Sequence, residues 1–259
     1  MSRLLLPLLL LLAGPAFAAA SEDPLAFAWQ QHPGAQLPLG TMLRDERGQP
    51  FRLGKAFNGV PVILQLGYFH CSALCGIVRA DLATAQRASG LSATDYALVS
   101  LSIDPAEQPG DAAKAKAADL GGLGTDAAPA WHYYLTGTPE GIGAVAATVG
   151  FRDRYDAQDK QFLHPTGLAI LTAGGVVSSY LLGVGYSGGD LRTAILRARG
   201  GAVAQGALPV LLLCFHYDPS TGRYTLAVIK LLRLFGGLTV VTVGGVLLLL
   251  HRYRREAAR

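Results

Sequence analysis

Two cysteines, Cys71 and Cys75, lie four positions apart in the stretch YFHCSALCGIV, residues 68–78. Such a pair can form a disulfide, act as a redox couple, bind a metal ion or pack as two buried thiols. The usual dithiol redox motif is C-x-x-C, whereas three residues intervene here. A closed structural zinc site needs four ligands, and the chain offers only one further cysteine, Cys214. The spacing therefore leaves a different metal site and redox chemistry both open.

Two thiolates and one imidazole would form a soft ligand set of low coordination number, which suits copper and Cu(I) above all. His164 is the strongest candidate for the imidazole, because it follows a polar segment and precedes a predicted hairpin, 89 positions after Cys75. Pro165 restricts the backbone of His164 to an extended form. His70, next to Cys71, is expected to point away across its strand. A lone histidine is more often a surface or core residue, so that interpretation stays open.

The hydrophobic pattern predicts the elements that would position the cysteines. Residues 60–69 and 96–104 are continuous apolar runs of strand length, typical of strands buried on both faces of a sheet. Between them, residues 76–89 suit a helix that begins near Cys75. The cysteines would then lie at a strand-to-helix turn, where unpaired N–H groups and the helix dipole favour thiolates.

The remaining body continues to alternate between strands and helices. We expect, in order, a loop entering a helix at 105–121, a strand at 131–137, a helix from Thr138 to Gly150, a polar loop at 151–162, a hairpin of strands 166–171 and 176–182, and a last helix at 190–198. Together these elements predict an α/β fold, a thioredoxin-like sandwich, over a domain at residues 21–205.

The two ends of the chain are its most hydrophobic parts. A basic residue, a short apolar run and the small residues Ala16 and Ala18 predict a cleaved N-terminal signal peptide at residues 1–20, with an uncleaved membrane anchor as the alternative. An uncharged apolar run near the other end, followed by HRYRREAAR, predicts a C-terminal transmembrane helix at 231–251 and a cytoplasmic tail at 252–259.

The charge distribution fits this organisation. The net charge of +4 comes from the two ends, because residues 21–225 hold slightly more acidic than basic side chains. Nothing in the body indicates a nucleic acid partner. We therefore expect a protein with a single pass through the inner (cell) membrane and its main domain in the periplasm, where Cys71 and Cys75 could form a disulfide.

At several positions the sequence resembles the Sco/SenC copper chaperones, over about residues 35–200. The matching features are the CxxxC of YFHCSALCGIV, the strand end SIDP at 102–105, Gly150 with Phe151, and His164 before a hairpin. The resemblance implies a thioredoxin-like fold that binds copper through Cys71, Cys75 and His164. It also implies that Asp104 lies nearby in a supporting role.

The same resemblance implies the partners. Family members help to assemble the CuA centre of cytochrome c oxidase, so the expected partners are the oxidase subunit that carries CuA, other periplasmic copper carriers or thiol reductants, and the inner membrane. The chain departs from the family at Ser72 and Gly76, where proline commonly follows each cysteine, so copper affinity or thiol reactivity is expected to differ.

The juxtamembrane segment at 206–230 contains a second motif, CFHYDPSTGRYT, which also resembles a bacterial branch of the family. Cys214 and His216 are two apart, so in an extended strand their side chains would share a face and could form a second metal or partner site. The alternative is a β-turn at 218–222 that packs the tether against the domain.

Two classes of function follow. The leading hypothesis is a metallochaperone, which is not an enzyme, that passes copper to the oxidase at the membrane. The alternative is a thiol-disulfide oxidoreductase that acts on periplasmic cysteines without carrying metal. A peroxidase on the same fold would need one cysteine to react alone, which the paired spacing disfavours.

Overall fold

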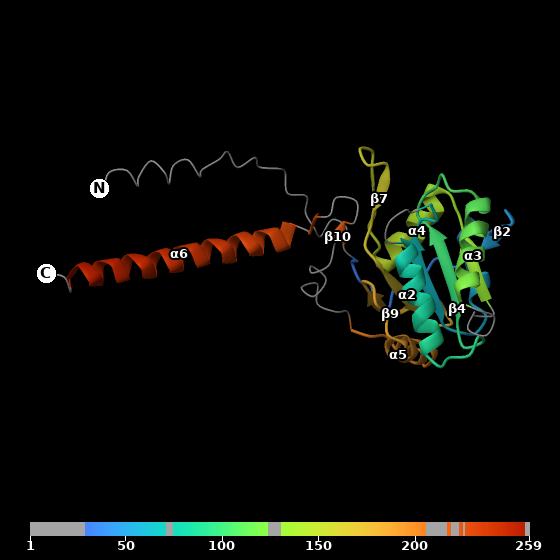
Figure 1. Cartoon of the computed structure of the whole chain (residues 1–259). Coiled ribbons are helices and arrows are strands. Elements are labelled where there is room, and N and C mark those ends of the chain that lie inside the picture. The colour runs from blue at the N-terminus through green and yellow to red at the C-terminus, as the bar shows by residue number, and fades with distance from the viewer. Residues whose placement is uncertain are drawn as a thin grey trace.

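The computed structural model describes residues 29–70, 75–123, 131–205, 217–218, 223–224 and 226–256. Three of the predicted strands form adjacent parallel strands on one side of a five-stranded sheet. The sheet order is β5-β4-β3-β8-β9. Its strands are β3 (Val62–Gly67), β4 (Ala97–Ser102), β5 (Trp131–Leu135), β8 (Gly167–Leu171) and β9 (Val177–Leu182). The first three run parallel, β8 runs antiparallel to β3, and β9 runs antiparallel to β8 (Figure 1).

The central strands are buried on both faces because their side chains alternate between two cores. Val62 and Leu64 of β3 belong to one hydrophobic cluster and Ile63 belongs to the other, and all three side chains are fully buried. Burying an aliphatic side chain of this size contributes ~1.5–3 kcal/mol. A continuous apolar run, rather than an alternating one, is therefore what this position in the sheet requires.

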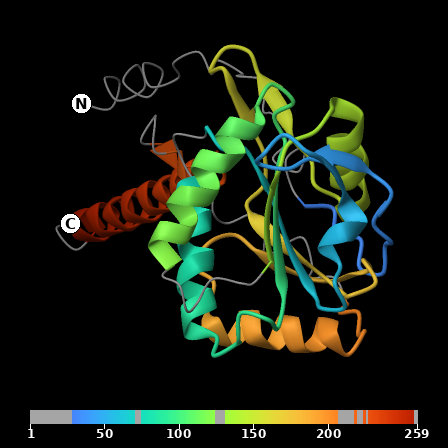
Figure 2. The same ribbon diagram turned by 90° about the vertical axis from the view of Figure 1, so that its right-hand side faces the viewer.

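Helices cover both faces of the sheet (Figure 2). One face packs against α2 (Cys75–Ala88), α3 (Pro109–Leu123) and α5 (Gly188–Arg199). The other face packs against α4 (Pro139–Val149) and the N-terminal segment, which contains β1 (Met42–Arg44), β2 (Pro50–Arg52) and the short 3-10 helix η2 (Leu53–Ala56). The predicted thioredoxin-like sandwich is confirmed.

Helix α4 shows how local chemistry set the element boundaries. Thr138 caps its start, where the side-chain oxygen accepts the N–H of Gly141, and Pro139 occupies the first turn. Gly150 ends the helix in the left-handed conformation at φ 69°. Both ends are those predicted from the sequence.

The prediction of a plain polar loop at residues 151–162 is wrong. The segment contains a hairpin of β6 (Arg154–Asp156) and β7 (Gln161–Leu163). Asp156 shapes its turn by accepting the N–H of Gln158 at 2.8 Å, and Tyr155 packs on Phe162 across the pair with ring centroids 5.1 Å apart. Strand β6 carries two charged residues, and both strands are only three residues long, so the sequence pattern gave no strand signal. The N-terminal strands and η2 were not predicted either.

The C-terminal part contains one long helix, α6 (Leu226–Glu256), preceded by the short pair β10 (Tyr217–Asp218) and β11 (Arg223–Tyr224). Within the described residues, Phe235–Tyr253 is the one stretch long and apolar enough to cross a membrane, and none of it is buried. It overlaps the predicted span at 231–251. The predicted signal peptide at 1–20 lies outside the described residues.

One buried histidine gives the domain a pH-dependent stability. His132 on β5 is 7% exposed, and among the described residues neither of its ring nitrogens has a hydrogen-bond partner. Burial, reinforced by the positive charge of Lys116, lowers the pKa of His132 from 6.5 to about 4. The folded state therefore holds His132 neutral.

As the pH falls from 6.5 towards 4, the unfolded chain binds a proton at His132 before the folded chain does, so the free energy of unfolding should decrease by ~3 kcal/mol. His132→Phe should remove this part of the pH dependence. Urea unfolding of the full chain in detergent, followed by the fluorescence of Trp29 and Trp131, measures it. His32→Phe, at an exposed position, serves as the control, and equal pH slopes in the His132 variant and the wild type would refute the assignment.

Candidate metal centre

The first predicted ligand pair lies where β3 leads into α2. Helix α2 begins at Cys75, as the sequence indicated. Cys71 falls outside the described residues, and for Cys75 only the helical backbone is described. Gly76 follows in the first turn, exposed, and a Cβ atom added there would meet no atom within 4 Å. Packing therefore does not require glycine at this departure from the family.

The antiparallel pairing of β3 with β8 brings the predicted histidine ligand to the same edge of the sheet. The last pair in the register is Gln65 with Leu168. Beyond it the chain leaves β3 towards the cysteines, and on the neighbouring strand it arrives from His164. The ring of His164 contacts that of Tyr68, with centroids 5.9 Å apart. The chain that leads towards the cysteines and the chain that carries His164 therefore lie side by side at the end of β3.

A small pocket joins these two segments. Its lining comes from the end of β3 and the two residues after it, from α2, and from the chain that enters β8. These residues are Gln65, Leu66, Gly67, Tyr68, Phe69, Val78, Arg79, His164, Thr166 and Gly167, and Ser100 and Leu101 of β4 complete the lining. Arg79 lies one helical turn after Cys75, and its Nε donates to Asp119 at 3.1 Å. The second turn of the helix that begins at Cys75 therefore faces the same pocket as His164.

His164 is partly buried and held on several sides. Its Nδ1 lies 3.0 Å from the carbonyl oxygen of Pro165, and its ring packs on Phe151 with centroids 5.6 Å apart. If Nδ1 carries the hydrogen and donates it to that carbonyl, Nε2 has the lone pair that a metal ion needs. Partial burial raises the pKa of the Asp153 carboxyl, an effect that the nearby His164, when positively charged, opposes.

The segment around His164 is in turn anchored by aromatic side chains. The indole nitrogen of Trp29 donates to the carbonyl oxygen of Thr166 at 3.1 Å. Trp29 also packs edge-on against Phe151 and Tyr180, with centroids 5.0 and 5.4 Å away. Trp29 thus helps to hold the chain that carries His164 in place.

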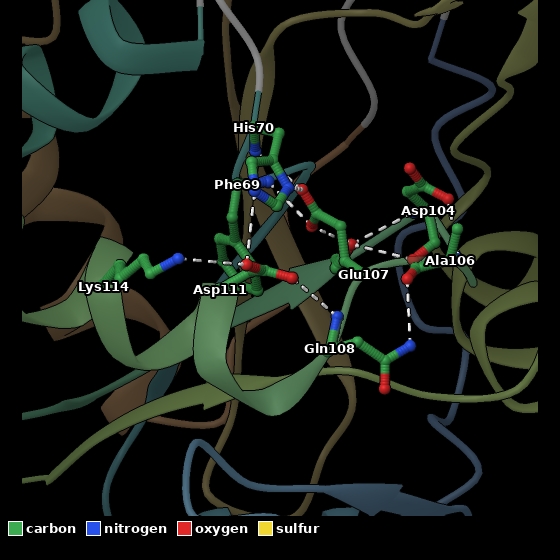
Figure 3. A network of polar contacts seen from close by, with 9 residues as sticks. Phe69, His70, Asp104, Ala106, Glu107, Gln108, Asp111 and Lys114 are labelled. Atoms are coloured by element: carbon green, nitrogen blue, oxygen red, sulfur yellow. Dashed lines mark hydrogen bonds and ion pairs between the residues drawn. The ribbon is translucent and has the colours of Figure 1, made fainter.

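Asp104 lies in the turn after β4. Its Oδ1 accepts the N–H of Ala106 at 2.8 Å, and its own N–H donates to the hydroxyl of Ser102 at 3.1 Å (Figure 3). The carboxylate therefore shapes this turn, and the predicted supporting role near copper stays a prediction.

Two acidic residues near the cysteines escaped the sequence analysis. Glu107 is buried, and its carboxylate accepts backbone N–H groups from Phe69 and His70, while Asp111 lies 3.2 Å from Nε2 of His70. The sequence signal was weak, because acids just before Pro109 and in the first turn of a helix are common at any helix start. Both belong to the polar network of Figure 3.

The other predicted sites are not brought together by the described residues. Cys214 and His216 lie outside them. The adjoining residues pair as two short strands, Tyr217 with Tyr224 and Asp218 with Arg223, and residues 219–222 of the predicted turn also lie outside the described residues. His32 lies at the surface, where its Nδ1 is 3.2 Å from the carbonyl oxygen of Thr148.

Comparison with known proteins gives a consistent picture. The family model SCO1/SenC matches residues 42–185, more than half of the chain. No curated protein sequence matches. Among solved structures, a protein of Aquifex aeolicus VF5 is 22% identical with a TM-score of 0.57, and 65% of this chain covers 95% of it.

Two further similar structures are Sco proteins. The copper-bound ScoI of Arabidopsis thaliana is 18% identical with a TM-score of 0.50, over 66% of this chain and 98% of that one. BsSco, described as a member of the Sco family of cytochrome c oxidase assembly proteins with a disulfide switch, is 17% identical with a TM-score of 0.50, over 66% and 97%. At these identities the likeness establishes the shared fold.

Gly150 directly precedes Phe151, whose ring packs on that of His164. A substitution at Gly150 therefore tests how this support depends on the local backbone. A Cβ atom there would lie 1.5 Å from the carbonyl oxygen of Gln30, at a positive φ. Gly150→Ala should therefore lower the free energy of unfolding by more than ~2 kcal/mol. Gly143→Ala is the matched control in the same helix, because its Cβ would meet nothing within 4 Å and should be neutral or stabilising by up to ~1 kcal/mol. Equal urea midpoints would contradict this account.

Proposed function

The chain belongs to the SCO1/SenC family, and on that basis we propose that it is a membrane-tethered copper chaperone. Copper is its cargo, held by the thiolates of Cys71 and Cys75 and by the imidazole of His164. Transfer proceeds by ligand exchange to an acceptor protein. The acceptor is the subunit of a respiratory cytochrome c oxidase that carries CuA.

The observation that carries the proposal is the shared pocket. His164 lines it together with Tyr68 and Phe69, which lead towards Cys71, and with Arg79, one turn beyond Cys75. A soft cation of low coordination number suits two sulfurs and one nitrogen. The Pro165 carbonyl orients the imidazole, as outer partners of metal-bound histidines usually do.

The C-terminal helix α6 contributes to the proposed function as a membrane anchor. The apolar stretch Phe235–Tyr253 of α6 is long enough to hold the domain at the inner membrane, with its body in the periplasm. Tethering confines donor and acceptor to one surface and raises their effective concentration. ScoI, whose structure contains copper, supports the cargo, and BsSco, a member of a family of cytochrome c oxidase assembly proteins, supports the recipient.

Competition for Cu(I) against a coloured chelator tests the ligand set in the reduced full chain in detergent. The wild type should hold one copper ion tightly. Cys71→Ser, Cys75→Ser and His164→Ala should each weaken binding by more than the ~10–100-fold that loss of an outer partner causes, because each removes a direct ligand. His32→Ala, at an exposed position away from the pocket, should bind as the wild type does.

Two results would count against copper transport. The first is a wild type that retains no stoichiometric copper, and the second is a His164→Ala variant with unchanged affinity. A chain that reduces a disulfide substrate normally after His164→Ala, but not after Cys71→Ser, would instead support the thiol-disulfide oxidoreductase. Cys214→Ser should leave the Cu(I) affinity of the main site unchanged, which would show that the juxtamembrane motif does not contribute to that site.

A further inference from the structure

Glu107 has an unusually complete set of hydrogen-bond donors for a buried carboxylate (Figure 3). Its side chain is 2% exposed. One oxygen accepts the N–H of Phe69 at 2.8 Å and the hydroxyl of Ser102 at 2.6 Å. The other accepts the N–H of His70 at 2.6 Å and lies 3.1 Å from Nδ1 of the same residue. Every neighbour in this set can donate a hydrogen bond, so the site suits an ionised carboxylate.

Burying a charge is costly unless donors surround it, and such an arrangement often contributes little to net stability. Such an arrangement does fix the positions of its partners, because moving any one of them leaves a buried charge without a hydrogen bond. The question is therefore which part of the chain this carboxylate holds in place.

The two backbone donors are the last two residues before Cys71. Ser102 and Glu107 lie at the end of the neighbouring strand β4 and in the turn that leads to α3. The carboxylate thus ties the chain that enters Cys71 to a rigid part of the sheet. A second contact supports it from outside, because Nε2 of His70 lies 3.2 Å from Asp111 on the first turn of α3.

We propose that Glu107 is a positioning residue for the cysteine pair: by holding the backbone of Phe69 and His70, it fixes the direction in which the chain reaches Cys71. Cys75 has separate support, since it begins α2. The inference deepens the proposed function, because both copper binding and disulfide formation need the two sulfurs close together. Losing the anchor should lower the effective concentration of one sulfur near the other in both reactions.

Metal-free protein gives the sharpest test. In a glutathione buffer, two glutathione thiols are oxidised to glutathione disulfide while the Cys71–Cys75 bond breaks and takes up two electrons and two protons. Mass spectrometry of the tryptic peptide at 56–79, which excludes Cys214, measures the two forms after alkylation. Glu107→Gln should lower the equilibrium constant for disulfide formation about tenfold, which makes the midpoint potential ~30 mV less negative.

Two companion variants separate positioning from charge. Glu107→Asp keeps the negative charge but shortens the side chain, so it should shift the potential in the same direction as Glu107→Gln. Ser102→Ala removes one donor to the carboxylate and should give a smaller shift of the same sign. Should Glu107→Gln fail to fold, the Ser102 variant decides the question.

Glu46→Gln is the matched control. Glu46 is also mostly buried and also binds an α3 side chain, with its Oε1 2.6 Å from Nζ of Lys116, but it holds no residue next to the cysteines. It should lower the urea midpoint without moving the potential. A Glu107→Gln potential equal to that of Glu46→Gln would overturn the proposal.

Copper competition provides the second measurement. Cu(I) affinity should fall about tenfold in Glu107→Gln and stay unchanged in Glu46→Gln. If the wild type holds no copper, the chaperone function fails, yet the shift in potential would still establish the positioning role. If copper binds normally and neither the potential nor the affinity responds to Glu107→Gln, the positioning role fails alone.

Discussion

The antiparallel pairing of β3 with β8 is the constraint on which the candidate centre depends. Strand β3 carries the chain towards the cysteines, and β8 receives the chain from His164, so their register sets where the two segments meet. Because β3 and β8 have fully buried residues on both faces, a slip of one residue would move aliphatic side chains from one core to the other. The two cores therefore lock the register and, with it, the site.

Each candidate ligand is then supported by a different part of the fold. Cys75 begins α2, where the helix terminus favours a thiolate. His164 lies against Phe151 and Tyr68 and is oriented by the Pro165 carbonyl. The chain that enters Cys71 is held by the carboxylate of Glu107. A site with independent supports needs little reorganisation when a cation binds or when the sulfurs join.

The proposed ligand set is compatible with two chemistries. The same two sulfurs can hold a soft cation together with an imidazole, or can form a disulfide without it. In the proposed function, His164 is the residue whose presence distinguishes copper transport from simple thiol exchange. Gly76, exposed in the first turn of α2, leaves the backbone at the helix start less restricted than a proline would. Packing does not require a glycine there, because an added Cβ atom would meet no other atom within 4 Å.

The sequence by itself determined the features whose cause is local. Continuous apolar runs specified β3 and β4, Thr138 and Gly150 specified the ends of α4, and an uncharged stretch specified the long C-terminal helix. The motif spacing also led to the family and to His164 as the predicted third ligand. In each case the signal lies within one element or in a resemblance to a known pattern.

Only the tertiary structure decided the contacts between distant residues. Glu107 is 37 positions from His70, and its role requires that the end of β4 lie beside the end of β3. The burial of His132 and the pairing of β6 with β7 likewise depend on neighbours that sequence periodicity does not specify. A buried carboxylate reads in sequence as an ordinary acid before a helix, because what distinguishes it is the set of donors that folding brings to it.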